Sequence, residues 1–188
     1  MYFIIHNVEK SVVLIDAENV FKQWKHFCED YNLKEKLDYQ RLVDKLAKNT
    51  NLLRAYFYDG TSENVASKKK SFLDALEKKG FQLRTKILKE RTFICPSCSN
   101  TITKHVQKGV DVSLATDILR HAFQQTCDIC IIASGDEDYK DAINVAKDKG
   151  IKVWVASFKR ALSPEMERAA DKVFLIDDFY DEIKRKIY

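Results

Sequence analysis

Residues 129–138 have the sequence ICIIASGDED, an apolar run that ends in a small-residue turn and three consecutive acids. A short apolar run bounded by turn residues is typical of a strand that is buried on both faces. Gly135 allows the backbone to turn tightly after this strand. Capping of a helix needs only one acid, so three in a row indicate a further role. We therefore expect Asp136 and Asp138 at the carboxyl end of a parallel strand, where open α/β sheets bind ligands.

Apolar runs alternate with helical patterns along the rest of the chain. The predicted strands are residues 12–15, 52–58, 81–87, 129–133, 151–156 and 173–176. The predicted helices are residues 20–29, 39–48, 62–79, 110–125, 139–149 and 164–170, with a final helix at 177–188. Gly80 and Gly150 stand just before strands, where a glycine commonly ends a helix. This alternation predicts one α/β domain over residues 1–188, with a mostly parallel sheet between two helical layers.

Composition indicates a globular protein and favours a reducing cellular compartment. Charged residues make up 32% of the chain and hydrophobic residues 45%, a balance found in folded rather than disordered proteins. No apolar run reaches the length of a membrane span, and the first residues lack the pattern of a secretory signal. The five cysteines are an odd number, which fits free thiols better than a disulfide framework. We therefore expect a cytoplasmic protein with no membrane partner.

Two further acidic motifs stand at predicted element boundaries. Asp16, followed by Asn19, ends the first apolar run, and Asp111 lies in the first turn of the helix that opens after Lys108-Gly109-Val110. Each acid alone has an ordinary alternative role, as a helix cap or as a partner of the helix dipole. Asp117 follows on the same helix but is rotated well away from Asp111. Carboxylates that converge at strand ends suit Mg²⁺ or Mn²⁺, which points to metal-assisted phosphodiester chemistry.

Residues 88–107 are too long for an ordinary connection between a strand and a helix. We interpret them as an insertion that projects from the strand-end face, beside the acidic motifs. Cys95 and Cys98 form half of a zinc site, to which His105 could add a third ligand. Residues 127–130 contain a second Cys-x-x-Cys pair, although its second cysteine also fits a buried strand. The sequence therefore leaves two alternatives open, a structural zinc site and a plain turn that binds no metal.

Basic residues are concentrated between residues 68 and 108, although the net charge of the chain is only +4. The lysines of residues 68–79, taken alone, are typical of a solvated helix face. Four cations in and after the insertion are candidates for binding nucleic-acid phosphates: Lys89, Arg91, Lys104 and Lys108. A basic segment beside an acidic metal site is what a phosphodiesterase acting on nucleic acid requires.

Three blocks of this sequence, at residues 16–19, 108–117 and 134–139, together resemble the signature of a known family. They are similar to the NYN domain family, in its LabA-like branch, which belongs to the PIN-like ribonuclease superfamily. The resemblance implies a PIN-like three-layer fold and metal-dependent endoribonuclease activity. By this resemblance the metal-binding acids are Asp16, Asp111 and Asp136, and the flanking polar positions are Asn19, Asp117 and Asp138.

The favoured hypothesis is an endoribonuclease that uses Mg²⁺ or Mn²⁺ to hydrolyse single-stranded or structured RNA, with a homodimer left open. Two alternatives remain at this level. A non-catalytic NYN module would bind RNA with an inert acidic site. A Toprim-like nuclease would use Glu18 with Asp136 and Asp138, but it does not explain the Lys-Gly-Val-Asp motif. A dehydrogenase is disfavoured because no glycine-rich dinucleotide motif follows the first strand.

Overall fold

The computed structural model describes residues 8–61, 66–87, 89–94, 98, 100–106 and 109–186, with the backbone alone for 89–94, 102–106 and 186. Its centre is a six-stranded sheet in the order β4-β3-β1-β7-β8-β9, in which every neighbouring pair is parallel. All six strands were predicted from the sequence: β1 (Lys10–Asp16), β3 (Asn51–Thr61), β4 (Phe81–Ile87), β7 (Ile129–Ala133), β8 (Lys152–Ser157) and β9 (Lys172–Leu175).

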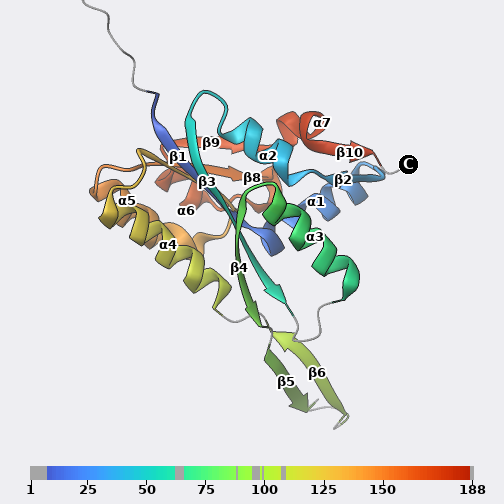
Figure 1. The fold of residues 1–188 in the computed structure, drawn as a ribbon. Coiled ribbons are helices and arrows are strands. Elements are labelled where there is room, and N and C mark those ends of the chain that lie inside the picture. Colours follow the sequence, from blue (N-terminus) through green and yellow to red (C-terminus); the bar gives the residue numbers. More distant parts are fainter. Residues whose placement is uncertain are drawn as a thin grey trace, which may run out of the picture.

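Helices cover both faces of this sheet, which gives the predicted three-layer α/β/α fold (Figure 1). The first face packs against α1 (Ala17–Asp30), α2 (Tyr39–Leu46) and α3 (Ser67–Lys78). The second face packs against α4 (Val110–Gln124), α5 (Lys140–Asp148) and α6 (Pro164–Ala169). None of the helices in the described part of the chain is long and apolar enough to span a bilayer.

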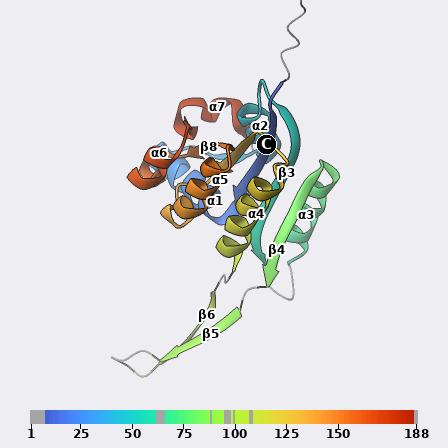
Figure 2. The same cartoon turned by 90° about the vertical axis from the view of Figure 1, so that its left-hand side faces the viewer.

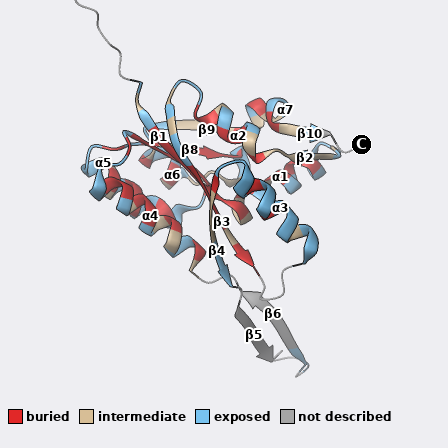
Figure 3. Ribbon diagram, viewed as in Figure 1, coloured by how far each residue is buried: buried red, intermediate tan, exposed pale blue. Residues whose placement is uncertain are grey.

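Two hydrophobic cores lie on either side of the sheet, because successive side chains of a strand point to opposite faces. In β1, Val13 and Ile15 join the core under α1 and α2, whereas Val12 and Leu14 join the core under α4 and α5. The two middle strands, β1 and β7, are therefore buried apart from Lys10 at the start of β1, as Figure 3 shows for the centre of the molecule. This rigid centre fixes where the strand ends, and the acids that follow them, can lie.

Helix ends also follow the sequence signals. Gly80 and Gly150 have φ values of +91° and +85°, a conformation that favours glycine, and each precedes a strand as predicted. The helix predicted at residues 62–79 begins at Ser67, and residues 62–65 lie outside the described part of the chain.

The predicted C-terminal helix at 177–188 is wrong in its extent. The chain forms a 3₁₀ turn, η3 (Ile176–Phe179), and only four residues of helix, α7 (Tyr180–Ile183). It then pairs as strand β10 (Lys184–Lys186) antiparallel to β2 (Glu35–Leu37). Burial of Ile183 in the core and the ladder to β2 override the local helical pattern.

The segment predicted to be an insertion contains a hairpin of β5 (Lys89–Ile94) and β6 (Thr101–Val106). The hairpin leaves the body at the end of β4 and projects away from it (Figure 2). Its return strand leads within a few residues to the start of α4, which carries Asp111. Both ends of the hairpin are therefore attached at the carboxyl edge of the sheet, as expected.

Candidate active site at the carboxyl edge of the sheet

Asp16 ends β1 and serves two roles at once. One carboxylate oxygen accepts a hydrogen bond from the backbone N–H of Asn19 at 3.1 Å and so caps α1. The other oxygen accepts hydrogen bonds from the hydroxyls of Ser134, at 3.3 Å, and Tyr139, at 3.0 Å. Only 4% of this residue is exposed. The capping role considered from the sequence is therefore real, yet it leaves a second oxygen directed into the site.

Tyr139 joins Asp16 to Asp111, although these acids are far apart in the sequence. Its hydroxyl lies 3.0 Å from an oxygen of Asp16 and 3.3 Å from an oxygen of Asp111. The two carboxylate oxygens thus cannot be farther apart than the sum of these two distances. A tyrosine hydroxyl carries a single proton, so it cannot donate a full hydrogen bond to both carboxylates at the same time. Two acids that share one proton donor form the core of the site.

The third acidic motif, residues 134–138, acts electrostatically on this pair. Burial raises the pKa of Asp16, and the charge of Asp111 raises it further against the hydrogen bonds that lower it. Burial likewise raises the pKa of Asp111, and the nearby charges of Asp136, Asp138 and Glu18 add to this effect. Acids from three separate segments therefore repel one another at this edge, which favours protonation or a bound cation.

Among the described residues, the Asp136 carboxylate has no hydrogen bond to Asp16, Asp111 or Tyr139. It is exposed, and one of its carboxylate oxygens accepts a hydrogen bond from the N–H of Asp138 at 3.2 Å, which caps the short turn η1 (Glu137–Tyr139). Within the described residues, no three Asp, Glu, His or Cys side chains form a group arranged to hold a metal ion. The structure thus brings Asp16 and Asp111 together, and it engages one oxygen of the Asp136 carboxylate as a cap while the charge of Asp136 still acts on Asp111. The donors present are carboxylate and hydroxyl oxygens, which are the ligands that Mg²⁺ and Mn²⁺ take.

The turn that carries Asp136 is held tightly against its neighbours. The hydroxyl of Ser134 accepts a hydrogen bond from the N–H of Asp136, and the side-chain oxygen of Asn19 accepts one from the N–H of Gly135. A Cβ on Gly135 would lie 2.1 Å from the carbonyl oxygen of Ala161. Glycine is therefore required by close approach of another backbone segment, which is a different reason from the tight turn expected from the sequence.

Asp117 lies apart from the acidic pair. Its buried carboxylate accepts hydrogen bonds from Tyr58, at 2.6 Å, from Arg84, at 3.3 Å, and from Arg120. Arg84 also lies over the ring of Tyr56. These partners satisfy both oxygens of Asp117 and link α4 to β3 and β4. Its place in this cage was not foreseen, because its partners come from strands 33 and 59 residues earlier in the chain.

The start of α4 explains how the second motif presents its acid. Gly109 has a φ of +85° and stands at the N-cap of α4, so the chain enters the helix through a conformation that favours glycine. Asp111 then falls in the first turn, where its carboxylate reaches Tyr139. Lys108 lies outside the described residues.

The candidate zinc ligands and hairpin cations are only partly described. Cys98 is an exposed free cysteine, and Cys127 and Cys130 are buried free cysteines. Cys95 lies outside the described residues, and the side chains of Lys89, Arg91, Lys104 and His105 do as well. Burial holds the pKa of the Cys130 thiol well above its usual value, as expected for a cysteine inside a strand.

Two site residues were missed by reasoning from the sequence. Ser134 and Tyr139 both contact Asp16, and both belong to the third motif, where only the acids were assigned roles. The available signal was their position, since Ser134 directly follows β7 and Tyr139 closes the turn after it.

Comparison with known proteins identifies the family and supports the fold. A family model described as the NYN domain matches residues 10–177. The "Low amplitude and bright protein LabA" of Synechococcus elongatus is 28% identical over 135 residues, which are 71% of this chain and 68% of LabA. A crystal structure of a Vibrio parahaemolyticus protein of unknown function shares the fold, with a TM-score of 0.69 and 22% identity over 96% of this chain and 98% of that one. Since the family match spans most of its length, this chain belongs to the NYN domain family.

Proposed function

We propose that this protein is a metal-dependent endoribonuclease that hydrolyses RNA phosphodiester bonds at the carboxyl edge of its sheet. The observation that carries the proposal is the convergence of Asp16 and Asp111 on the single hydroxyl of Tyr139. Such a pair is costly to hold in a partly buried site unless a cation compensates for it. Membership of the NYN family, which is related to nucleases, supports the same conclusion.

Three carboxylates would hold one or two Mg²⁺ or Mn²⁺ ions: Asp16, Asp111 and Asp136. A bound ion would supply an activated water at neutral pH and would stabilise the charge that develops on the scissile phosphate. Asp136 caps the turn η1 through one carboxylate oxygen, so its other oxygen would be the one to take part.

The remaining residues position these acids and the substrate. Asn19 holds the turn before Asp136 through the N–H of Gly135, and Asp138 would orient the attacking water. Asp117, an alternative for that role, instead organises Arg84 and its neighbours through its cage. Attack by water would leave a 5′-phosphate and a 3′-hydroxyl.

Substrate phosphates would be held by cations of the hairpin and of the segment that follows it: Lys89, Arg91, Lys104 and Lys108. The support is the path of the backbone, which attaches the hairpin at the edge that carries the acids (Figure 2). The cysteines of the hairpin, with or without zinc, would hold its tip.

Of the two rivals, the Toprim-like nuclease is disfavoured, because the family match is to the NYN domain. Glu18 forms an ion pair with Lys22 on α1, and the acid that meets Asp16 at Tyr139 is Asp111. The non-catalytic RNA-binding module remains the rival that experiment must separate.

The test incubates the purified protein with unstructured and structured RNAs in Mn²⁺, Mg²⁺ or EDTA, and measures binding and cleavage in parallel. We expect cleavage only with a divalent ion and only with an intact Asp136. Asp136→Asn is compared with Asp148→Asn, an exposed acid at the other end of α5, which should cleave as the wild type does. RNA binding without cleavage under any of these conditions would favour the non-catalytic module.

A further inference from the structure

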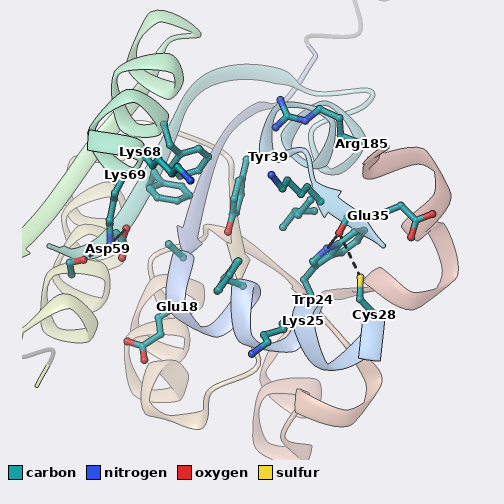
Figure 4. Close-up of a pocket in the computed structure, with 17 residues that line it drawn as sticks. Glu18, Trp24, Lys25, Cys28, Glu35, Tyr39, Asp59, Lys68, Lys69 and Arg185 are labelled. Carbon is teal, nitrogen blue, oxygen red and sulfur yellow. Dashed lines mark hydrogen bonds and ion pairs between the residues drawn. The ribbon is translucent and has the colours of Figure 1, made fainter. Parts of the chain in front are cut away.

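A groove of about 910 Å³ opens on the first face of the molecule, between α1, α3 and the strand pair β2–β10 (Figure 4). Ligand sites in proteins span roughly 300 to 1,000 Å³, so this groove is near the upper end of that range. Its floor is aromatic, with Trp24, Tyr39 and Phe57 largely buried. None of the three acids of the proposed active site lines it, although Glu18, two residues after Asp16, does.

Two aromatic side chains of the groove remain open to solvent. Phe21 on α1 is 56% exposed, and Phe72 on α3 is 40% exposed. The ring of Phe72 is held by Tyr39 and Phe57, each 5.9 Å from it between centroids. An exposed aromatic ring supported from behind is a surface on which an unpaired base can stack.

The charges of the groove favour an anionic occupant. Each of its carboxylates has a lysine partner: Glu18 with Lys22, Asp59 with Lys69, and Glu35 with Lys184. By contrast, Lys36, Lys68 and Arg185 have no carboxylate partner among the described residues. Lys68 and Arg185 stand on opposite sides of the groove (Figure 4). The groove therefore presents unpaired positive charge on both walls.

One pair of cations in the groove lies close enough for the like charges to repel each other. Arg185 of β10 lies directly opposite Lys36 of β2 in the antiparallel ladder. Residues opposite each other in such a ladder share one face, and like charges there destabilise the pairing. An anion bound between the two side chains would remove this repulsion. Phosphates of a nucleic-acid backbone meet this requirement at the same place where exposed rings offer stacking.

The groove leads to the edge that carries the active site. It begins at Ala17 and Glu18, which directly follow Asp16, and it includes Asp59 and Gly60 at the end of the neighbouring strand β3. Burial raises the pKa of Tyr39, whose ring lies in the floor, and the charges of Asp59 and Asp16 raise it further. A chain that leaves the acids can therefore enter the groove without crossing the molecule.

We propose that this groove binds a single-stranded segment of RNA that flanks the cleaved bond. This inference rests on the proposed function, because it assigns the substrate as RNA. Unpaired bases stack on Phe21 and Phe72, while backbone phosphates contact Lys68 and the Lys36–Arg185 pair. A duplex is excluded from this mode because its bases are already stacked on one another and cannot reach the rings. Lys68 thus has a role beyond the solvated face predicted for it.

The experiment measures binding in EDTA, where no cleavage is required, with a fluorescent unstructured RNA and a duplex RNA of equal length. Phe21→Ala should weaken binding of the single strand about 5- to 100-fold, which corresponds to the loss of one stacked base. Phe123→Ala serves as the matched control, because Phe123 is 63% exposed on α4, on the other face of the sheet. Both variants should keep the melting temperature of the wild type within a few degrees.

Lys68→Gln provides a second, independent readout at a fully solvated position. It should reduce the slope of log K against log salt by about 0.7, the value for one phosphate contact on a single strand. Lys78→Gln, at the other end of the same helix, should leave the slope unchanged. The proposal is overturned if single-strand affinity and salt slope match the wild type in Phe21→Ala and Lys68→Gln, or if duplex RNA loses the same affinity. That outcome leaves cleavage at the acids intact, so failure of the groove and failure of the proposed function are distinguishable. Binding of a peptide in place of RNA would equally overturn it.

Discussion

Replacing Asp111 with asparagine should stabilise the protein when no divalent metal is present. Asp111 meets Asp16 at the hydroxyl of Tyr139, and its pKa is raised by burial and by the charges of Asp136 and Asp138. Asparagine keeps an oxygen that can accept the hydrogen bond from Tyr139, but it removes one of the repelling charges. The substitution therefore isolates the electrostatic cost of the acidic site.

The expected change in the free energy of unfolding is a balance between lost repulsion and a lost favourable interaction. Two unit charges about 6 Å apart repel by about 0.7 kcal/mol in water and about 2.8 kcal/mol at an effective dielectric constant of 20. Asp111 as a whole residue is exposed and only its carboxylate is partly removed from water, so the lower part of this range applies. Loss of its favourable interaction with the N-terminus of α4 costs about 0.3 to 1 kcal/mol. The charges of Asp136 and Asp138 add to the repulsion, and we expect a net gain of about 1 kcal/mol, or about 2 to 4 °C in melting temperature.

The stability gained by Asp111→Asn should change with pH in a direction that can be checked. The folded-state pKa values of Asp16 and Asp111 lie above the ordinary aspartate value of 3.8, so the cost of ionising them is present at neutral pH. This cost is lost as the pH falls through the folded-state pKa values toward 3.8, because the carboxyls then become protonated in the folded protein. The advantage of Asp111→Asn should therefore shrink in acid.

The assay is thermal unfolding in EDTA from pH 4 to 8, with Asp148→Asn as the control for loss of an exposed acid. Adding Mn²⁺ should raise the melting temperature of the wild type more than that of Asp111→Asn, because a ligand stabilises the folded state that binds it. A melting temperature for Asp111→Asn equal to or below that of the wild type at pH 7 would refute the electrostatic reasoning.

Three further predictions test the supports of the site. Gly135→Ala should lower the free energy of unfolding, measured by chemical denaturation, by about 1 to 3 kcal/mol and also impair cleavage, because the new Cβ would lie 2.1 Å from the carbonyl oxygen of Ala161. An unchanged denaturation midpoint would contradict the close approach. Asp117→Ala should lower stability by about 2 to 3 kcal/mol, since it leaves a buried tyrosine hydroxyl and two arginines without their shared partner, while the cleavage rate per folded molecule holds. A selective loss of cleavage would instead return Asp117 to the catalytic group. Neutralising Arg91 and Lys104 together should weaken single-stranded RNA binding evenly across sequences and reduce its salt slope by about 1.4, and an unchanged slope would remove the hairpin from the binding surface.

The fold follows from the sequence because its signals are local. Each central strand is a short apolar run, and Gly80 and Gly150 end helices through a conformation that favours glycine. The C-terminal tail breaks this pattern, since the ladder between β10 and β2 depends on residues about 150 positions away. No local pattern carries that pairing.

The site is predictable in part for the same reason. Motifs at the end of a strand and at the start of a helix identify Asp16 and Asp111, because both boundaries lie at the edge where parallel strands end. The cage around Asp117 and the bridge through Tyr139 depend on which side chains meet across the sheet. Spacing along a helix predicts that Asp117 points away from Asp111. It does not predict that Asp117 contacts two arginines.

The central claim is that the acids at the sheet edge form a metal-dependent nuclease site. The most direct measurement is the cleavage rate of one labelled, unstructured RNA by the wild type and by Asp136→Asn, in Mn²⁺ and in EDTA, with analysis of the new ends. The account predicts products with 5′-phosphates from the wild type in Mn²⁺, and a loss of at least about 100-fold in the variant or in EDTA, as for removal of a major electrostatic contribution to catalysis. Cleavage that continues in EDTA, or at the wild-type rate in Asp136→Asn, would contradict it.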